Sequence, residues 1–214
     1  MGGRIASYFP VLMDYRDQAG TMAGHYYHQD LLVAQLIHAA NPERHVDVGS
    51  RVDGFVAHVA SFRQIEIADI RPLESHSRNI SFLQADLMEA NLGEGLTDSL
   101  SCLHTLEHFG LGRYGDKIDP TGHLKGFRNL IAMVKSGGDF YISFPISSRE
   151  RVEFNAHRVF HPRSPLGWDG ADNLILKSFH FIDDRGFLIS DSSVDDAVAA
   201  DLTYGCGVYV FEKK

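Results

Sequence analysis

Three ionisable side chains lie close together in the sequence, in the middle of the chain: His104, Glu107 and His108. Either Glu107 or His108 is a candidate general base, because a positioned carboxylate or imidazole can deprotonate a bound hydroxyl. The same residues spell H-x-x-E-H, the pattern of inverted zinc peptidases, in which two histidines bind zinc and the glutamate activates water. That chemistry requires a long helix, but here the pattern follows a strand-like run, and Gly110 and Gly112 would interrupt a helix. We therefore predict no metal ligands, and a metal-dependent hydrolase using these three residues is kept as an alternative.

A second polar segment covers residues 149–163, where arginines and histidines are interleaved with phenylalanines. Arg151, His157 and Arg158 are predicted to hold an acceptor molecule, because guanidinium groups bind anionic or sugar-phosphate groups through paired hydrogen bonds. Tyr114, in a glycine-rich loop, is predicted to join them. A charged loop that only faces solvent is the alternative interpretation of this segment.

Residues 45–60 have the pattern of a short apolar strand, a turn at Gly49 and a helical segment. Glycine lets the backbone approach a ligand closely, and the unpaired N–H groups that begin the following helix favour an anionic group. A second apolar strand ends at Asp69, whose carboxylate would accept hydrogen bonds from a ribose. Past a third strand, Asp86 and Leu87 are candidates to contact a purine amino group and ring, although Asp86 is equally consistent with capping a turn. This pattern indicates a nucleoside-containing cofactor.

Five strand-like runs alternate with helical segments over residues 45–145. This alternation predicts an α/β fold with a doubly wound, mostly parallel, seven-stranded sheet and helices on both faces. Two further strand-like runs, residues 174–182 and 207–211, are predicted to add an antiparallel C-terminal edge. Because the carboxyl ends of parallel strands share one edge, both polar segments should face the same crevice as the Gly49 turn.

The chain shows no internal repeat or low-complexity linker, which predicts a single domain over residues 1–214. Residues 1–27 are rich in glycine and aromatic residues without a clear period, and are predicted to form a lid or an N-terminal arm.

The formal charge is −8, from 20 basic and 28 acidic residues, which argues against a general nucleic-acid binder. The two cysteines, Cys102 and Cys206, lie in apolar strand-like runs without metal-ligand spacing and are predicted to be buried free thiols. No apolar run is as long as a membrane span requires, and the first residues lack the pattern of a signal peptide. We therefore expect a cytoplasmic protein without a membrane span.

Taken together, these motifs resemble the class I S-adenosylmethionine-dependent methyltransferases over about residues 45–145. Longer segments, within and beyond this core, look like an uncharacterised bacterial and nematode branch of that superfamily, catalogued as a domain of unknown function. The segments that carry the superfamily resemblance are Val46 to Ser50 with Gly54, Asp69, Asp86 with Leu87, Leu106 to His108, and Lys135 to Phe140. The segments that carry the resemblance to the branch are Asp47 to Phe55, Leu106 to Asp116 and Arg151 to Phe160.

The resemblance implies S-adenosylmethionine as the cofactor and assigns an expected role to each motif. Asp47 belongs to the cofactor-binding turn, and His104 would lie on the sulfonium side. Arg51 replaces the usual second glycine, and it would either grip the cofactor carboxylate or obstruct the pocket. The remaining expected contacts are Gly49 and Ser50 with the methionyl part, Asp69 with the ribose, and Asp86 and Leu87 with the adenine.

The function implied is methyl transfer from S-adenosylmethionine to a hydroxyl of a small polar acceptor, with a sugar in surface glycan biosynthesis as the suggested example. The alternative is a non-catalytic, methyltransferase-like module that binds a nucleoside ligand or a partner protein in the same crevice.

Overall fold

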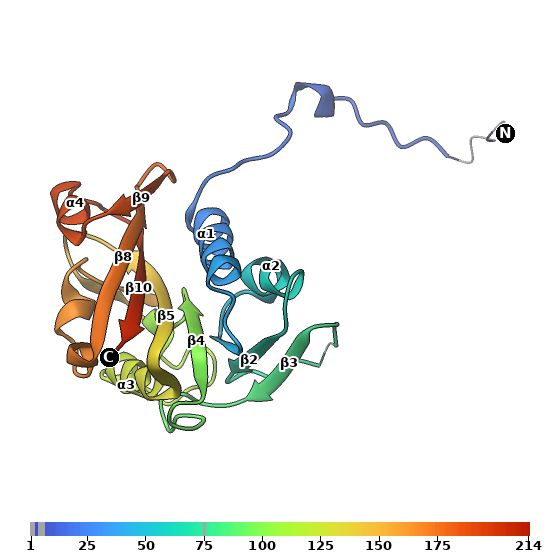
Figure 1. Cartoon of the computed structure of the whole chain (residues 1–214). Coiled ribbons are helices and arrows are strands. Elements are labelled where there is room, and N and C mark those ends of the chain that lie inside the picture. Colours follow the sequence, from blue (N-terminus) through green and yellow to red (C-terminus); the bar gives the residue numbers. More distant parts are fainter. Residues whose placement is uncertain (1–2, 4–6, 75) are drawn as a thin grey trace.

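The computed structural model describes residues 3, 7–74 and 76–214, and it is built on one eight-stranded sheet. The strand order is β3-β2-β1-β4-β5-β10-β8-β9 (Figure 1). The first five strands in that order are parallel to one another, and each of the last three is antiparallel to its neighbour. The strands are β1 (His45–Val48), β2 (Ile65–Asp69), β3 (Ile80–Gln84), β4 (Thr97–Leu103), β5 (Val134–Ile146), β8 (Leu174–Ile182), β9 (Leu188–Ser192) and β10 (Gly205–Lys213).

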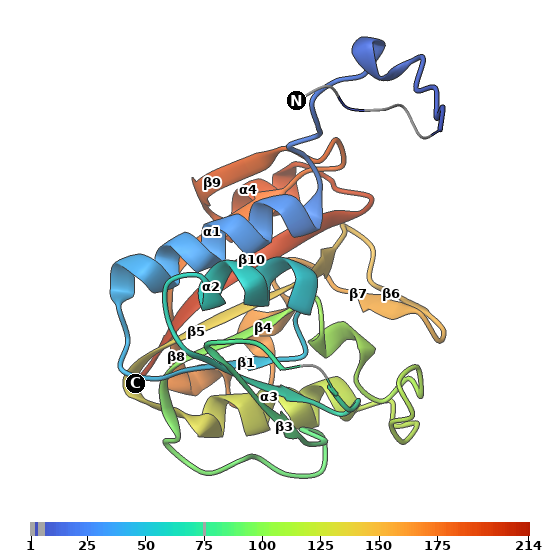
Figure 2. The same ribbon diagram turned by 90° about the vertical axis from the view of Figure 1, so that its right-hand side faces the viewer.

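Helices cover both faces of this sheet, as Figures 1 and 2 show. On one face lie α1 (His25–Ala40) and α2 (Ala57–Ala60), and on the other lie α3 (Gly122–Met133) and α4 (Val194–Ala199). Among the described residues, none of the helices combines the length and the apolar character that crossing a bilayer demands. The predicted fold class is therefore confirmed, and β9 gives the sheet one strand more than the seven expected.

Short elements complete the chain and are concentrated around the loops. β6 (Arg151–Glu153) and β7 (His157–Val159) form a separate antiparallel hairpin, which Figure 2 shows on the same side of the molecule as the loop of residues 109–120. The tight helical turns are η1 (Asp14–Arg16), η2 (Val52–Val56), η3 (Leu106–His108), η4 (Ser164–Gly167) and η5 (Ala171–Asn173).

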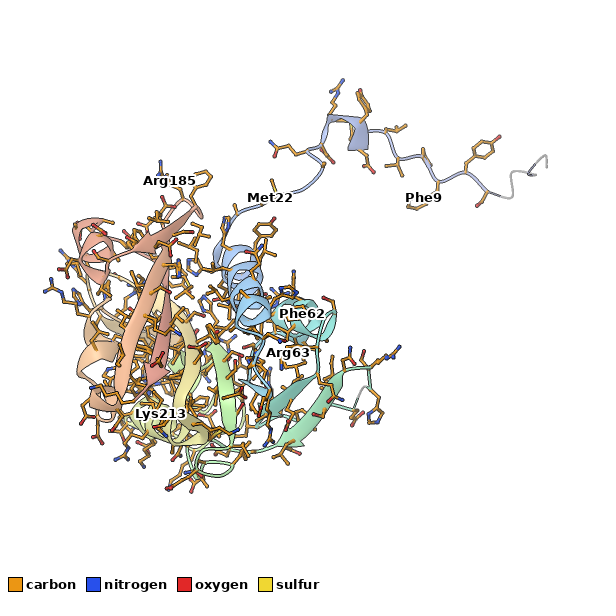
Figure 3. The ribbon with its side chains drawn as sticks, viewed as in Figure 1. Phe9, Met22, Phe62, Arg63, Arg185 and Lys213 are labelled. Carbon is orange, nitrogen blue, oxygen red and sulfur yellow. The ribbon has the colours of Figure 1, made fainter. Side chains whose placement is uncertain are left out.

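The N-terminal segment does not pack on the domain over its described part. Residues 7–20 are exposed, and the chain runs outward to Phe9, as Figures 1 and 3 show. At the end of this segment, the Gly24 N–H donates a hydrogen bond to the Gly186 carbonyl, at 2.9 Å. Helix α1 begins at His25, so the last three residues of the segment expected to form an arm belong to a helix.

Side chains on the two faces of the sheet form two separate apolar cores, because successive residues of a strand point to opposite faces. Val46 of β1, Leu100 of β4 and Phe140 of β5 pack on the α3 side, where Phe127 of α3 is fully buried. The α1 and α2 side buries a second cluster that includes Val33, Phe55, Ile65 and Val208. Strand β1 is buried at all four positions, which is the pattern expected for a central parallel strand.

On the α2 side, however, β1 carries polar side chains instead of apolar ones. His45 and Asp47 face Ser99 and Ser101 of β4 across the parallel register. The ring of His45 lies 2.8 Å from Ser99 Oγ through Nδ1 and 3.1 Å from Ser101 Oγ through Nε2. Ser101 Oγ donates to Asp47 Oδ1 at 2.6 Å, so this hydroxyl is left to accept a hydrogen bond from the Nε2–H of His45.

Asp47 continues this network to the ends of both strands. Its carboxylate also accepts from the backbone N–H of Ser50 at 3.1 Å and from Ser50 Oγ at 2.6 Å. Ser50 Oγ in turn accepts from the Leu103 N–H, at the last residue of β4. Burial raises the pKa of Asp47 to about 6, against the lowering effect of these hydrogen bonds. The network therefore ties the turn after β1 to the end of β4.

We predict that His45→Gln removes part of the acid sensitivity of the fold. Burial lowers the pKa of His45 to about 3, against 6.5 in the unfolded chain, so the unfolded state binds more protons between these values. The stability of the native protein is therefore lost as the pH falls from 6.5 towards 3. Relative to His45→Gln, the free energy of unfolding of the native protein should fall by about 2.5 kcal/mol between pH 7 and pH 4.5.

Urea unfolding at several pH values measures this difference. The exposed His76 provides the matched control, since His76→Gln should leave the pH dependence unchanged. Parallel pH profiles of the native protein and His45→Gln would contradict the prediction.

Candidate functional site

A cavity of about 800 Å³ opens at the carboxyl ends of β1, β2, β4 and β5. This is the edge at which open α/β sheets bind ligands, and the volume is within the usual range for small-molecule sites. Most of the residues predicted from the sequence lie around it: Gly49, Ser50, Arg51, Asp69, His104, Glu107, His108, Tyr114 and His157.

A smaller hollow of about 60 Å³ adjoins this cavity on the β3 side. Asp86 and Leu87 line it, and Gly49, Asp69 and Tyr114 line both spaces. Asp86 Oδ1 also accepts from the Met88 N–H at 2.9 Å, so it caps its own turn while lining the hollow. The predicted nucleoside-contacting residues are therefore adjacent in space.

Gly49 is required by the geometry of the turn after β1. Its φ is +70°, in the left-handed region, and a Cβ at this position would lie 2.3 Å from Thr105 Cγ2. The Gly49 N–H donates to the Ala68 carbonyl at 2.9 Å, which links the turn to β2. The turn is thus packed against the segment after β4 and leaves its own backbone at the cavity wall.

Arg51, which replaces the usual second glycine, lines the cavity without filling it. Its guanidinium pairs with Asp53 through hydrogen bonds of 3.1 and 3.0 Å and lies 4.8 Å from the ring centroid of Tyr26. The side chain is about half exposed, at 49%. Arg51 therefore lies at the wall of the cavity, paired with Asp53.

Asp69 lies between the two spaces, and its carboxylate is already paired. Arg71 donates to it from the backbone N–H at 2.8 Å and from the guanidinium at 3.0 and 2.7 Å. The same guanidinium lies 4.4 Å from the ring centroid of Tyr114, where it forms a cation–π contact. A carboxylate has about four lone-pair sites, so Asp69 has acceptor capacity left for a ligand.

The segment after β4 turns sharply and points three ionisable side chains at the cavity. His104 has a φ of +50°, and its N–H donates to the Ser143 carbonyl at 2.9 Å. His104 Nδ1 lies 2.8 Å from Glu107 Oε1, and the Glu107 residue is only 1% exposed. Burial acts to lower the pKa of His104, but the Cys206 sulfur and the Glu107 carboxylate outweigh it and raise the pKa above its ordinary value.

His108 has the features of a neutral base. Its Nδ1 lies 2.7 Å from the Ala156 carbonyl, which can only accept, so the proton resides on Nδ1 and Nε2 carries the lone pair. Burial lowers the pKa of His108, which keeps the ring neutral at pH 7. Glu107 Oε1 lies 3.7 Å from Nε2, where it would stabilise a proton taken up by the ring.

The helix required for an inverted zinc peptidase is not what this segment forms. Leu106–His108 is a single 3-10 turn, and His104 precedes it in the left-handed conformation. His104 Nδ1 lies against Glu107, and His108 Nδ1 lies against the Ala156 carbonyl. This segment therefore lacks the long helix on which the inverted zinc peptidase pattern depends.

Both of the predicted acceptor-binding arginines make other contacts in the fold. Arg158 is 4% exposed, and its guanidinium donates to the carbonyls of Phe109 at 2.6 Å and of Glu107 and Pro120 at 3.3 Å each. Arg151 pairs with Glu153 at 2.7 Å. Neither lies among the described residues that line the two spaces, so Arg158 braces the loop above the site and the prediction that it holds the acceptor is wrong.

The cavity also contains side chains that the sequence motifs did not single out. His25 and Tyr26 come from the start of α1, Arg71 and Arg113 from loops, and Tyr204 from the turn before β10. Burial lowers the pKa of His25 to about 4, and the charge of His104 adds to this effect. No sequence motif marked Tyr204, which lies just before the strand predicted for residues 207–211.

One protein-family model matches residues 59–174 of the chain. Its description is "Caenorhabditis protein of unknown function, DUF268". The match covers more than half of the chain. The chain belongs to the DUF268 family. Among curated proteins, none matches it.

Solved structures extend the comparison to the fold of this DUF268 chain. The 1,6-didemethyltoxoflavin-N1-methyltransferase of Burkholderia thailandensis, solved with S-adenosylhomocysteine, has a TM-score of 0.59 at 16% identity, over 87% of this chain and 78% of that one. The N-methyltransferase NodS of Bradyrhizobium japonicum WM9, also with S-adenosylhomocysteine, has a TM-score of 0.54 at 13% identity, over 89% and 88%. The [4+2]-cyclase SpnF has a TM-score of 0.58 at 14% identity, over 86% and 80%.

The predicted resemblance is thus confirmed: this DUF268 chain has the fold of S-adenosylmethionine-dependent methyltransferases. Because SpnF is a cyclase with the same fold, the fold by itself does not decide the reaction.

We predict that Gly49→Ala destabilises the protein by about 2–4 kcal/mol, from a strained φ and from the overlap with Thr105. Chemical denaturation measures the loss. Thr105→Ser removes the methyl group that the new Cβ would meet, so adding it to Gly49→Ala should recover part of the loss. Gly115→Ala is the matched control, because Gly115 has a φ of +87° in open space. Equal losses at the two glycines would contradict the packing argument.

Proposed function

We propose that the protein transfers a methyl group from S-adenosylmethionine to a hydroxyl of a small polar acceptor. The observation that carries this proposal is the pair of adjoining spaces at the strand ends, with Asp69 between them and Asp86 and Leu87 in the smaller one. Proteins solved with S-adenosylhomocysteine share this fold, which supports the choice of cofactor.

The residues around these spaces fit such a cofactor. Gly49 leaves its backbone at the wall of the cavity, so an amino acid group can approach the turn. Asp69 offers acceptor sites to a ribose diol, and the half-exposed Arg51 can meet a carboxylate. When bound, the sulfonium group supplies an electrophilic methyl carbon, and the task of the protein is then to align and deprotonate the acceptor.

His108 is the base that the geometry favours for this task. Its Nε2 lone pair would accept the hydroxyl proton, the Ala156 carbonyl holds the ring in the required tautomer, and Glu107 stabilises the resulting imidazolium. In this arrangement His108 takes up the proton, and Glu107 stabilises the charge that results. His157, Arg113 and Tyr114 line the same part of the cavity and supply hydrogen-bonding groups for the acceptor.

A sugar, as in surface glycan biosynthesis, is the acceptor class that we propose. Tyr26, Tyr114 and Tyr204 place aromatic faces and hydroxyl groups around the cavity, and Arg71 and Arg113 add cationic donors. This mixture of aromatic and hydrogen-bonding groups suits a polyhydroxylated ring with an anionic substituent.

The second candidate is a non-catalytic module with the same fold. It is favoured by the pairing of Asp69 with Arg71, which occupies three acceptor positions of the carboxylate that would otherwise face the ribose. Methyl-transfer activity, measured together with the binding of S-adenosylhomocysteine, separates the two candidates.

We predict that S-adenosylhomocysteine binds and that Asp69→Ala weakens this binding by about 10-fold or more, because the ribose loses charged acceptors. Titration calorimetry measures the affinity. Asp169→Ala is the matched control, since Asp169 is an exposed aspartate that pairs with Arg128 on the surface. Absence of binding by the unmodified chain would remove the enzyme interpretation.

We predict that His108→Gln lowers the methyl-transfer rate by about 100-fold or more, while the affinity for S-adenosylhomocysteine changes little, because only the proton acceptor is lost. Release of S-adenosylhomocysteine in the presence of sugars and nucleotide sugars measures the rate. His28→Gln, on helix α1, provides the control. A His108→Gln protein with full activity would exclude His108 as the base.

A further inference from the structure

A compact group of metal-ligating side chains lies at the wall of the cavity. His25 of α1, His104 after β4 and Cys206 of β10 each place one ligand atom within 4.8 Å of the other two. The rings of His25 and His104 are stacked, with their centroids 5.3 Å apart. These residues are 79 or more positions apart in the sequence, so only the fold brings them together.

His104 is oriented as metal-ligating histidines usually are. Its Nδ1 is held by the buried carboxylate of Glu107, and its Nε2 is buried without a hydrogen-bond partner among the described residues. A carboxylate on one ring nitrogen fixes the tautomer and leaves the other nitrogen as a ligand. The side chain is 5% exposed, so an unpartnered nitrogen here is costly unless something binds it.

Cys206 is likewise buried with only weak partners. Its Sγ lies 3.7 Å from Gln29 Oε1 and 3.8 Å from the Gly207 carbonyl. A thiolate at Cys206 and the Glu107 carboxylate would together balance the charge of a divalent ion. One sulfur and two imidazole ligands are the donor set that zinc accepts readily.

We propose that His25, His104 and Cys206 bind a zinc ion whose fourth coordination position faces the cavity. Tetrahedral zinc with its usual bond lengths places ligand atoms about 3.3–3.7 Å apart. The three ligand atoms must therefore move about 1 Å closer together to bind one ion. His25 and His104 line the cavity, which leaves the open position on that side. Three protein ligands with one open position are typical of zinc that contacts a substrate.

Zinc binding by the full-length chain tests the proposal. After treatment with a chelator, the protein is titrated with Zn²⁺ in competition with a chromogenic chelator. We expect one equivalent to bind tightly, and Cys206→Ala and His25→Ala each to weaken binding on the order of 100-fold or more. Cys102→Ala, at a buried cysteine of β4, and His38→Ala, at an exposed histidine of α1, are the matched controls and should not change it.

Cobalt substitution gives a second readout that does not depend on affinity. Co²⁺ bound to the chain should show the charge-transfer absorption of a thiolate ligand, and Cys206→Ala should abolish it while circular dichroism shows a retained fold. Glu107→Gln should weaken zinc binding by about 10–100-fold and keep the absorption, because Glu107 only orients His104.

Failure to bind a stoichiometric ion, or binding that Cys206→Ala and His25→Ala leave unchanged, would overturn the proposal. All of these measurements are made without S-adenosylmethionine. Their outcome is therefore independent of whether the protein transfers methyl groups.

Discussion

The buried carboxylate of Asp47 is the constraint on which the arrangement of the site depends. It is 0% exposed, and among the described residues its hydrogen-bond donors come from Ser50 and Ser101. An ionised group removed from water is tolerated only where such donors are in place, because a missing partner leaves the full desolvation cost. The ends of β1 and β4 must therefore stay in register, and this fixes the Gly49 turn against Thr105.

The same constraint explains why the segment after β4 can be so strained. His104 adopts a left-handed conformation, and the next residues form one 3-10 turn, which points His104, Glu107 and His108 into one wall. Arg158 secures this turn from behind through the carbonyls of Glu107 and Phe109. A buried arginine is thus used to hold backbone groups, and the cavity is left to histidines, tyrosines and more exposed arginines.

The antiparallel strand β10 gives this domain a feature that a purely parallel sheet would lack. The Gly205 end of β10 pairs with Ile146 at the carboxyl end of β5, so residues that begin a strand lie beside residues that end one. Tyr204 and Cys206 reach the cavity region by this route. Residues from the last tenth of the chain can therefore contribute functional groups to the wall of the cavity.

Much of this protein was determined by local sequence. Alternating apolar runs and helical segments specified the α/β sheet, and Gly49, Asp69 and Asp86 marked the strand ends, because backbone conformation and strand-end position depend on neighbouring residues. Only the tertiary structure decided the roles of Arg158, His25 and Cys206. Burial, charge pairing and ligand geometry depend on side chains brought together from distant elements, and no spacing along the chain records those distances.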